Sequence, residues 1–322
     1  MLRIVFQVIL IFYNIINAYN IDNYWQQDVD YKMKVSLIDS VRQLTGTSTI
    51  KYTNNSPDSL DRIYMHLYPN AFQKNSVKYR EYLDNYGRKS RAKDIQESLD
   101  TFISKIEVHN LSISLPQEGF SWIHKKSILS SFNIEDTILE INLSNKIGPG
   151  ETSRIDLSWT HHIGEMVERA GFHKGQYNMA QWYPKIAVYD HNGWNADFFH
   201  AEGEFYGEFG TFEVELTMPK AFVVAATGVV ESGDPGWSDV EVDTSFDFNI
   251  WRDIFDSTYI APKSNESRNV TFIAKNVHDF AWVASKNFFY EGGKSKDLET
   301  DIHVLYDRDR GMNWSKVVLD RS

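Results

Sequence analysis

The sequence predicts a mainly β protein: an antiparallel multi-sheet or sandwich domain, followed by the start of an α/β unit. Three observations predict this fold class. Aromatic residues make up 14% of the 322 residues, and flat rings pack well on pleated sheets. Apolar and polar residues alternate along many short stretches, which is the period of half-buried strands. Turn signals such as Gly-Pro-Gly at 148–150 separate these stretches.

Composition excludes several classes of function. The formal net charge is −11 and no long basic run is present, so binding to nucleic acid through neutralised phosphates is not expected. The chain contains no cysteine. It therefore has no disulfide framework, no thiol nucleophile and no cysteine-based zinc site.

Residues 1–18 are predicted to be a signal peptide. Arg3 supplies a short positive region, residues 4–16 are mostly apolar, and Ala18 lies where a small residue precedes the cleavage point. A membrane anchor or a buried strand is the alternative, but the apolar stretch is short for a bilayer span. We expect an exported protein, periplasmic or secreted, with no transmembrane span after cleavage.

The strands follow in order along the chain. In 62–68, Ile63, Met65 and Leu67 share one face, and in 211–218, Phe212 and Val214 begin a second such face. Residues 74–97 are densely charged and predict an excursion with one short exposed helix. Further strands are expected at 31–37, 48–53, 102–112, 137–143, 154–159, 222–230, 240–248, 269–274 and 280–284.

The end of the chain reads as a second unit. Residues 292–296 look like a linker and 301–306 like a strand. Trp314, Val317 and Val318 then fall at helical spacing, as in the start of an amphipathic helix. We therefore divide the chain into a β-domain at 19–285 and a truncated further domain at 286–322, with a boundary that single-sequence patterns fix only to within several residues.

Two blocks of sequence carry a specific resemblance. The first comprises 24–27, 29–31 and 60–72, the last reading LDRIYMHLYPNAF. The second runs MAQWYPKIAVYD at 179–190 and continues through 193–194 and GEFYGEFG at 203–210 into 225–228. Together they resemble the N-terminal β-domain of M1 family (gluzincin) zinc metallopeptidases, which are aminopeptidases, in a bacterial branch. The resemblance covers roughly Tyr24 to Ala284, and the sequence from Asp301 looks like the opening of the catalytic domain.

The resemblance implies zinc in the full-length parent. The family's catalytic domain carries His-Glu-x-x-His on a helix and a distant Glu, which hold the metal that activates water. This chain contains no such run, and no histidine follows His303. We expect no catalytic residue and no metal ligand here, and no hydrolysis by this chain alone. Its expected partners are peptide substrates, for which it would form one wall of the cleft, and its own catalytic domain.

Gln181 is the one candidate substrate-binding residue. M1 enzymes use a Gln of the N-terminal domain, near a turn with Pro and Asp, to hold the free amino end of the substrate, and Gln181 resembles it in a setting with Pro184 and Asp190. An amide oxygen can accept a hydrogen bond from an ammonium group without adding charge. The family's spacing and its Cys after the Pro are not kept here. The alternative is an ordinary loop amide.

Three other groups favour structural interpretations. His161, His162 and Glu165 could form a metal cluster only on a helix, whereas they follow a strand. Glu202, Glu204 and Glu208 are expected on the solvated face of a strand, with Phe205 and Phe209 packed against the domain, rather than as an acid/base pair. Aromatic residues could line a sugar-binding face, but burial is the default for such rings; the ones in question are Trp182, Trp194 and Trp282.

Two further hypotheses stay open. The chain could be a stand-alone exported β-sandwich that binds a glycan or a protein, as its aromatic content and acidic surface allow. It could also belong to a family member that has lost catalysis and kept the architecture.

Overall fold

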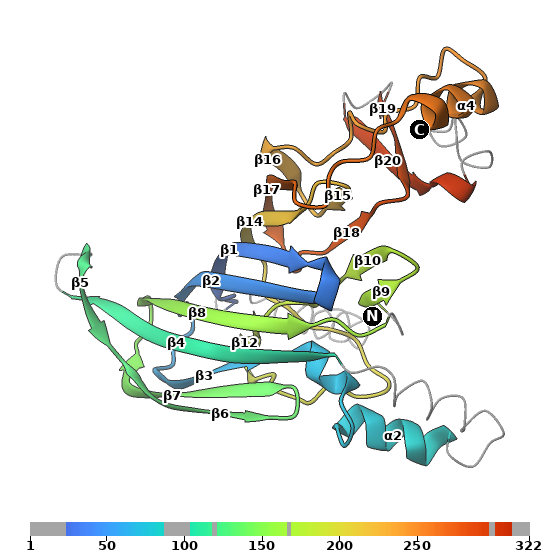
Figure 1. Ribbon diagram of the computed structural model, residues 1–322. Coiled ribbons are helices and arrows are strands. Elements are labelled where there is room, and N and C mark those ends of the chain that lie inside the picture. Colours follow the sequence, from blue (N-terminus) through green and yellow to red (C-terminus); the bar gives the residue numbers. More distant parts are fainter. Residues whose placement is uncertain (1–23, 87–103, 118–120, 166–168, 296–299, 311–322) are drawn as a thin grey trace, which may run out of the picture.

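The computed structural model describes residues 24–86, 104–117, 121–165, 169–295 and 300–310, and it confirms a mainly β protein (Figure 1). The predicted signal peptide and the predicted helix around Trp314 lie outside the described residues. Among the described residues, no helix combines the length and the apolar character that a membrane crossing requires.

A large sheet runs through the molecule, and its neighbouring strands are antiparallel except for the parallel pair β1 and β14. The alternation predicted from the sequence is visible in β1, where every second side chain is buried. Its eight strands, in spatial order, are β16 (Val229–Gly233), β17 (Ser267–Val277), β14 (Gly210–Pro219), β1 (Asp28–Ile38), β2 (Gln43–Thr53), β8 (Thr152–His162), β4 (Lys105–Gln117) and β5 (Ser121–Ser127).

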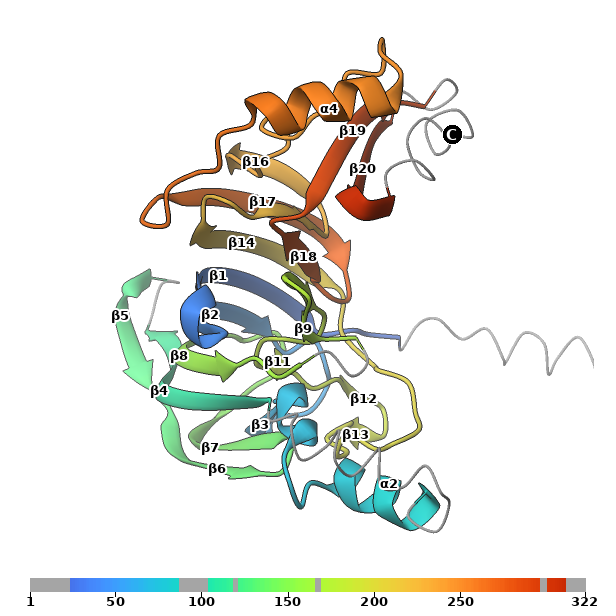
Figure 2. The same cartoon turned by 45° about the vertical axis from the view of Figure 1, so that its right-hand side comes forward.

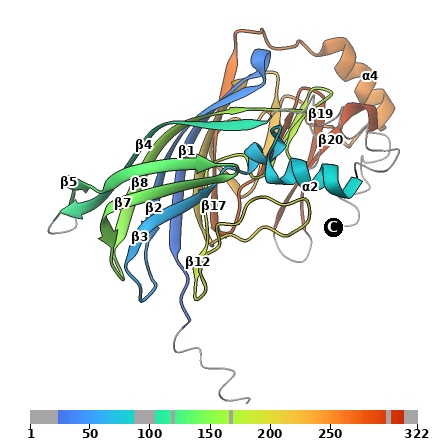
Figure 3. The same ribbon diagram turned by 90° about the horizontal axis from the view of Figure 1, so that it is seen from below.

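Smaller sheets pack against this sheet and share its main core. The layer of β3, β7 and β6 lies beside the β2–β8–β4 end, as seen from below in Figure 3. One smaller sheet consists of β11 (Lys185–Ile186), β3 (Leu60–His66), β7 (Ile138–Ile147) and β6 (Leu129–Glu135), another of β15 (Val223–Ala226), β18 (Trp282–Ser285), β10 (Gln176–Met179) and β9 (Gly171–His173), and a hairpin of β12 (Tyr189–Asp190) and β13 (Gly193–Trp194).

A second, smaller core lies at the other end of the large sheet (Figure 2). Helix α4 (Phe248–Thr258) packs there on the hairpin of β19 (Phe288–Lys294) and β20 (Asp301–Asp307). Val240, Val242 and Phe289 belong to this core, so it draws side chains from both sides of the predicted boundary at 285. The remaining helical elements are α2 (Val77–Tyr86), η2 (Asp39–Val41), η3 (Tyr68–Phe72) and η4 (Arg308–Arg310).

The strand predicted at 240–248 is wrong. Asp247 instead caps a helix, because its carboxylate accepts a hydrogen bond from the Asn249 backbone N–H at 3.0 Å. Helix α4 then presents Phe248, Trp251 and Phe255 on one stripe towards Phe289, which is the spacing of an amphipathic helix.

Other expectations fail at glycines and short strands. The linker predicted at 292–296 is wrong at its start, since Gly292–Lys294 belong to β19, while residues 296–299 lie outside the described part. The strand predicted at 222–230 is divided between β15 and β16 at Gly228, whose φ is +89. The strands β5, β6, β9 to β13 and β19 were not predicted. Of these, β9 to β13 have only two to four residues, which is short for a period to be read. The helix expected in 74–97 is α2, although Lys78 and Tyr79 are buried rather than exposed.

Gly46 leaves room for the largest side chain of the main core. It pairs with Trp159 across β2 and β8, and a Cβ added at Gly46 would lie 2.2 to 2.6 Å from the Trp159 ring. The indole is held in place, since its Nε1 donates to Ser48 Oγ at 3.0 Å. The absence of a side chain at residue 46 therefore permits the two strands to pair over an indole.

We predict that Gly46→Ala lowers the free energy of unfolding by about 2–3 kcal/mol, the cost of forcing extra volume into a packed core. Urea denaturation followed by circular dichroism measures it. Gly148→Ala is the control, because a Cβ there meets only the flexible end of Glu151 at 3.2 Å. Equal effects of the two substitutions would contradict the packing argument.

Candidate functional site

Trp182 lies fully buried between the sheets and fixes the backbone around the candidate residue Gln181. Its ring packs on Trp159 of β8 and on Trp282 of β18, with centroid distances of 5.8 and 6.1 Å. Its Nε1 donates to the Phe280 carbonyl at 2.9 Å, and its own carbonyl accepts from His161 Nδ1 at 3.0 Å. The ring N–H and the backbone carbonyl of Trp182 thus both have hydrogen-bond partners. These bonds and the ring contacts fix the backbone at this residue.

Gln181 takes up a strained conformation as a result. Its φ is +55, in the left-handed region, and only 8% of the residue is exposed. A left-handed conformation costs a residue with a side chain about 1–2 kcal/mol. Strain of this kind concentrates at functional sites, where the surrounding structure enforces it. No hydrogen bond to another described residue holds the Gln181 side-chain amide.

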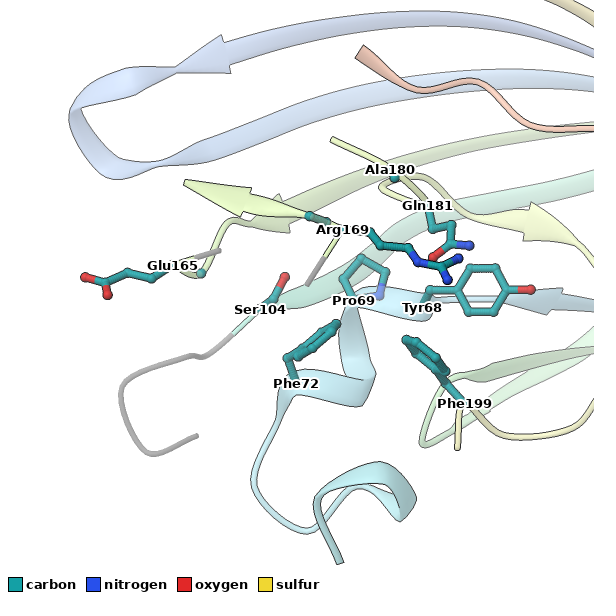
Figure 4. Close-up of a pocket in the computed structure, with 11 residues that line it drawn as sticks. Tyr68, Pro69, Phe72, Ser104, Glu165, Arg169, Ala180, Gln181 and Phe199 are labelled. Carbon is teal, nitrogen blue, oxygen red and sulfur yellow. The ribbon is translucent and has the colours of Figure 1, made fainter. Parts of the chain in front are cut away.

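The Gln181 amide faces a pocket with apolar walls (Figure 4). Tyr68, Pro69 and Phe72 form one side, and Phe199 lies opposite the amide. The cavity measures about 20 Å³, which is room for about one water molecule, so only a group of that size, such as an ammonium, fits beside the amide. The Gln181 amide thus borders a pocket, and its role towards a ligand stays a prediction.

Arg169 also lines this pocket and was not identified from the sequence. Its guanidinium lies over the Phe205 ring, 5.1 Å from the centroid, and Figure 4 shows Arg169 among the residues around the pocket. A guanidinium donates hydrogen bonds and never accepts them, so it suits a carbonyl or carboxylate of a ligand and repels an ammonium group. No pattern in the sequence points to Arg169, because it is a single exposed cation in a loop.

His161 has a structural role. It is buried at the end of β8, and burial lowers its pKa to about 3. Its Nδ1 donates to the Trp182 carbonyl, and its Nε2 lies 2.9 Å from Ser104 Oγ. Both nitrogens of the neutral ring therefore have hydrogen-bond partners. Glu165 is exposed, 3.9 Å from Arg42. Within the described ranges, no group of three or more His, Cys, Asp or Glu is placed to hold a metal ion.

The glutamates at 202–208 do not lie on a strand. Glu202 and Glu204 are exposed as expected, but the expectation for Glu208 is wrong: it is buried, and burial raises its pKa to about 7. Phe205 packs against Tyr68 with a centroid distance of 4.9 Å, as expected. Phe209, also expected to pack, is 45% exposed. In an irregular loop the period of two does not apply, so the alternation assigned the wrong faces to Glu208 and Phe209.

The tryptophans do not form a sugar-binding face. Trp182 and Trp282 are buried in the core, as the default interpretation has it. Trp194 is half-buried and packs on Tyr64 and Tyr189, with centroid distances of 5.7 and 5.1 Å. Trp182 and Trp282 therefore offer no surface to a sugar, and the Trp194 ring is partly covered by its neighbours.

Comparison with known proteins gives a structural likeness only. No family model matches this sequence, and no curated protein matches it. Among solved structures, a mutant M1 zinc metallopeptidase from Deinococcus radiodurans bound to a Tyr-Ser-Ala substrate is similar at 12% identity and a TM-score of 0.45, over 87% of this chain and 47% of that one. A two-domain M1 zinc metallopeptidase mutant bound to L-tryptophan is similar at 12% identity and a TM-score of 0.44, over 88% and 48%. The chain spans about half the length of these structures.

We predict that Glu208 makes stability depend on pH. The folded protein raises the Glu208 pKa from 4.5 to about 7, so between these values the folded state binds more protons than the unfolded state, and stability falls as pH rises. Glu208 lines a pocket at the surface, and screening by solvent there reduces the effect to about 1–2 kcal/mol.

Chemical denaturation at intervals between about pH 4 and pH 8 measures this effect. Glu208→Gln should remove that part of the slope, because an amide does not titrate in this range. Glu204→Gln, on the same loop but exposed, should leave the slope unchanged. Identical slopes for the protein and its Glu208→Gln variant would contradict the assignment.

Proposed function

We propose that this chain is the N-terminal, non-catalytic β-domain of an exported zinc metallopeptidase that removes N-terminal residues from peptides. In this proposal the domain forms one wall of the substrate cleft. The observation that carries it is Gln181, whose amide has no hydrogen-bond partner among the described residues and borders a pocket with mainly apolar walls.

The sequence and the geometry support the same residue independently. The block at 179–190 carries the resemblance to M1 N-terminal domains, and Gln181 lies within it. Residues 181–188 are all buried. Gln181 is the first of them, and it lines a pocket. The packing of Trp182 accounts for the Gln181 backbone, so what favours a ligand role over an ordinary loop amide is that the amide borders a pocket and has no hydrogen-bond partner among the described residues.

Two groups at the pocket suit the two ends of a peptide unit. The Gln181 amide oxygen can accept a hydrogen bond from a substrate ammonium group, and the Arg169 guanidinium can donate to the carbonyl oxygen that follows. Zinc would supply the nucleophilic water in the parent enzyme. The described residues offer no set of ligands for it, so a catalytic domain beyond this segment would have to hold the metal.

We predict that the protein binds a tripeptide with a free amino terminus more tightly than the same peptide N-acetylated. A hydrogen bond to a charged group contributes about 1.5 kcal/mol or more, which is about a 10-fold difference in Kd. Gln181→Ala should abolish the difference. Titration by nuclear magnetic resonance measures these weak affinities, and C-terminal amidation of the peptide tests whether Arg169 recognises a carboxylate instead.

Gln176→Ala is the matched control, since the Gln176 amide already donates to Asn178 Oδ1 at 2.8 Å and does not line the pocket. It should keep the preference for the free amine. Equal affinities for the free and the acetylated peptide, or a preference that survives Gln181→Ala, would overturn the role of Gln181.

The parent activity has a separate test in the coding sequence beyond codon 322. An open frame that encodes His-Glu-x-x-His and a downstream Glu would support the peptidase. A frame without these ligands would overturn it and favour the binding or inactive alternatives. Export is tested by N-terminal sequencing of the mature protein, which should begin at Tyr19.

A further inference from the structure

A second pocket lies where the chain enters β1, on the hairpin of β12 and β13. It measures about 360 Å³, which is room for one long side chain or a small organic molecule. Its walls are aromatic, from Trp25, Tyr189 and Tyr206, and Tyr24 stands at its mouth with 71% of its surface exposed. None of these residues belongs to the Gln181 pocket, so this is a separate site.

A buried carboxylate closes the pocket on one side. Glu208 is 7% exposed, and its Oε1 has no hydrogen-bond partner among the described residues. The backbone N–H groups of Gln27 and Tyr189 face this carboxylate. An acceptor left unpaired in a buried position costs about 1–3 kcal/mol. The aromatic pocket borders this buried carboxylate, which lacks part of its hydrogen-bond complement among the described residues.

Neighbouring groups fix the orientation of the aromatic rings that line the pocket. Trp25 stacks on Tyr189 with centroids 5.8 Å apart, and the Tyr189 hydroxyl donates to Asp58 at 2.9 Å. The faces of such rings carry negative potential and attract cations. Because these rings are fixed before a ligand arrives, little side-chain entropy is lost on binding.

The charges that line the pocket are negative. Asp190 adds a second carboxylate, fixed by the Asn192 backbone N–H that donates to its Oδ1 at 2.8 Å. No lysine or arginine lines the pocket, in contrast to the Gln181 pocket with its Arg169. Two carboxylates beside aromatic faces form the chemistry that selects a cation.

We propose that this pocket binds a primary alkylammonium group. A primary ammonium has N–H donors for the Glu208 carboxylate, which a quaternary ammonium lacks, and a methylene chain that packs on the rings. Such a group occurs on the lysine side chain of a peptide and on a free diamine, and the probes below separate these sources. The inference is independent of the proposed function.

Binding should strengthen as pH rises from about 6 to 8, because the Glu208 carboxyl, with a pKa raised to about 7 by burial, must be ionised to attract the cation. The other titratable groups that face Glu208 or line the pocket are tyrosine hydroxyls, Asp190 and His191. The tyrosines are Tyr24, Tyr31, Tyr52, Tyr189 and Tyr206.

The test is a titration of the ¹⁵N-labelled protein, followed at the Trp25 indole, with three probes: Nα-acetyl-lysine methylamide, cadaverine and the neutral Nα-acetyl-norleucine methylamide. We expect the two amines to bind at least about 10-fold more tightly than norleucine, as a charge-assisted hydrogen bond of about 1.5 kcal/mol requires. Binding of both amines, or of one only, supports the site and identifies the source.

Glu208→Gln should weaken amine binding about 10-fold, and Tyr206→Leu, which keeps apolar area without a π face, should weaken it several-fold. The exposed Glu204 is the matched control, and Glu204→Gln should change nothing. Gln181→Ala should also leave amine binding intact, which separates this site from the peptide pocket.

Two results would overturn the proposal. Equal affinities for the lysine and norleucine probes would mean an apolar pocket without charge selection. Amine binding that is unchanged in Glu208→Gln, with the variant folded as judged by its thermal unfolding, would remove the buried carboxylate from the site.

Discussion

The burial of Trp182 is the constraint on which the rest of the molecule depends. Its ring joins Trp159 of the large sheet to Trp282 of a smaller one, so two sheets that are not hydrogen-bonded to each other share one aromatic contact. Burying an indole of this size with its N–H satisfied contributes several kilocalories per mole. Gly46 and His161 serve the same contact, one by leaving space for Trp159 and the other by holding the Trp182 carbonyl. Because the ring cannot move, the residue before it must take the backbone conformation that remains.

The features that suggest function lie on the loops that leave this core. Gln181 is strained, and Glu208 is buried with an unpaired oxygen, while the strands around them are regular. A rigid scaffold can bear such local costs of one or two kilocalories per mole, because the packing of the sheets exceeds them many times. Loops positioned on a rigid scaffold are where binding residues concentrate.

The alternation of apolar and polar residues predicted the half-buried strands well and the other elements poorly. Strands β1, β8 and β14 each have one buried face, so their alternation was readable. Val240 and Val242 also alternate, but they serve the second core, and Asp247 starts a helix that alternation conceals. Gln181 was singled out only by resemblance, and its left-handed backbone could not be foreseen, because glutamine is not a residue that favours that region. The burial of Glu208 was predicted wrongly, because side chains in an irregular loop do not alternate between buried and exposed positions.

The two pockets differ in charge and share one rigid support. Residues 181–188 are all buried; Gln181 begins this run, and Tyr189 and Asp190 of the second pocket follow its end. The run is held by Trp182 on one side and by the pairing of Lys185 and Ile186 with β3 on the other. A change in the packing of Trp182 must therefore disturb both pockets together, whereas the loss of a polar group at Gln181 or Glu208 disturbs one. The pattern of defects across the two pockets thus distinguishes a residue that binds from one that only holds the wall.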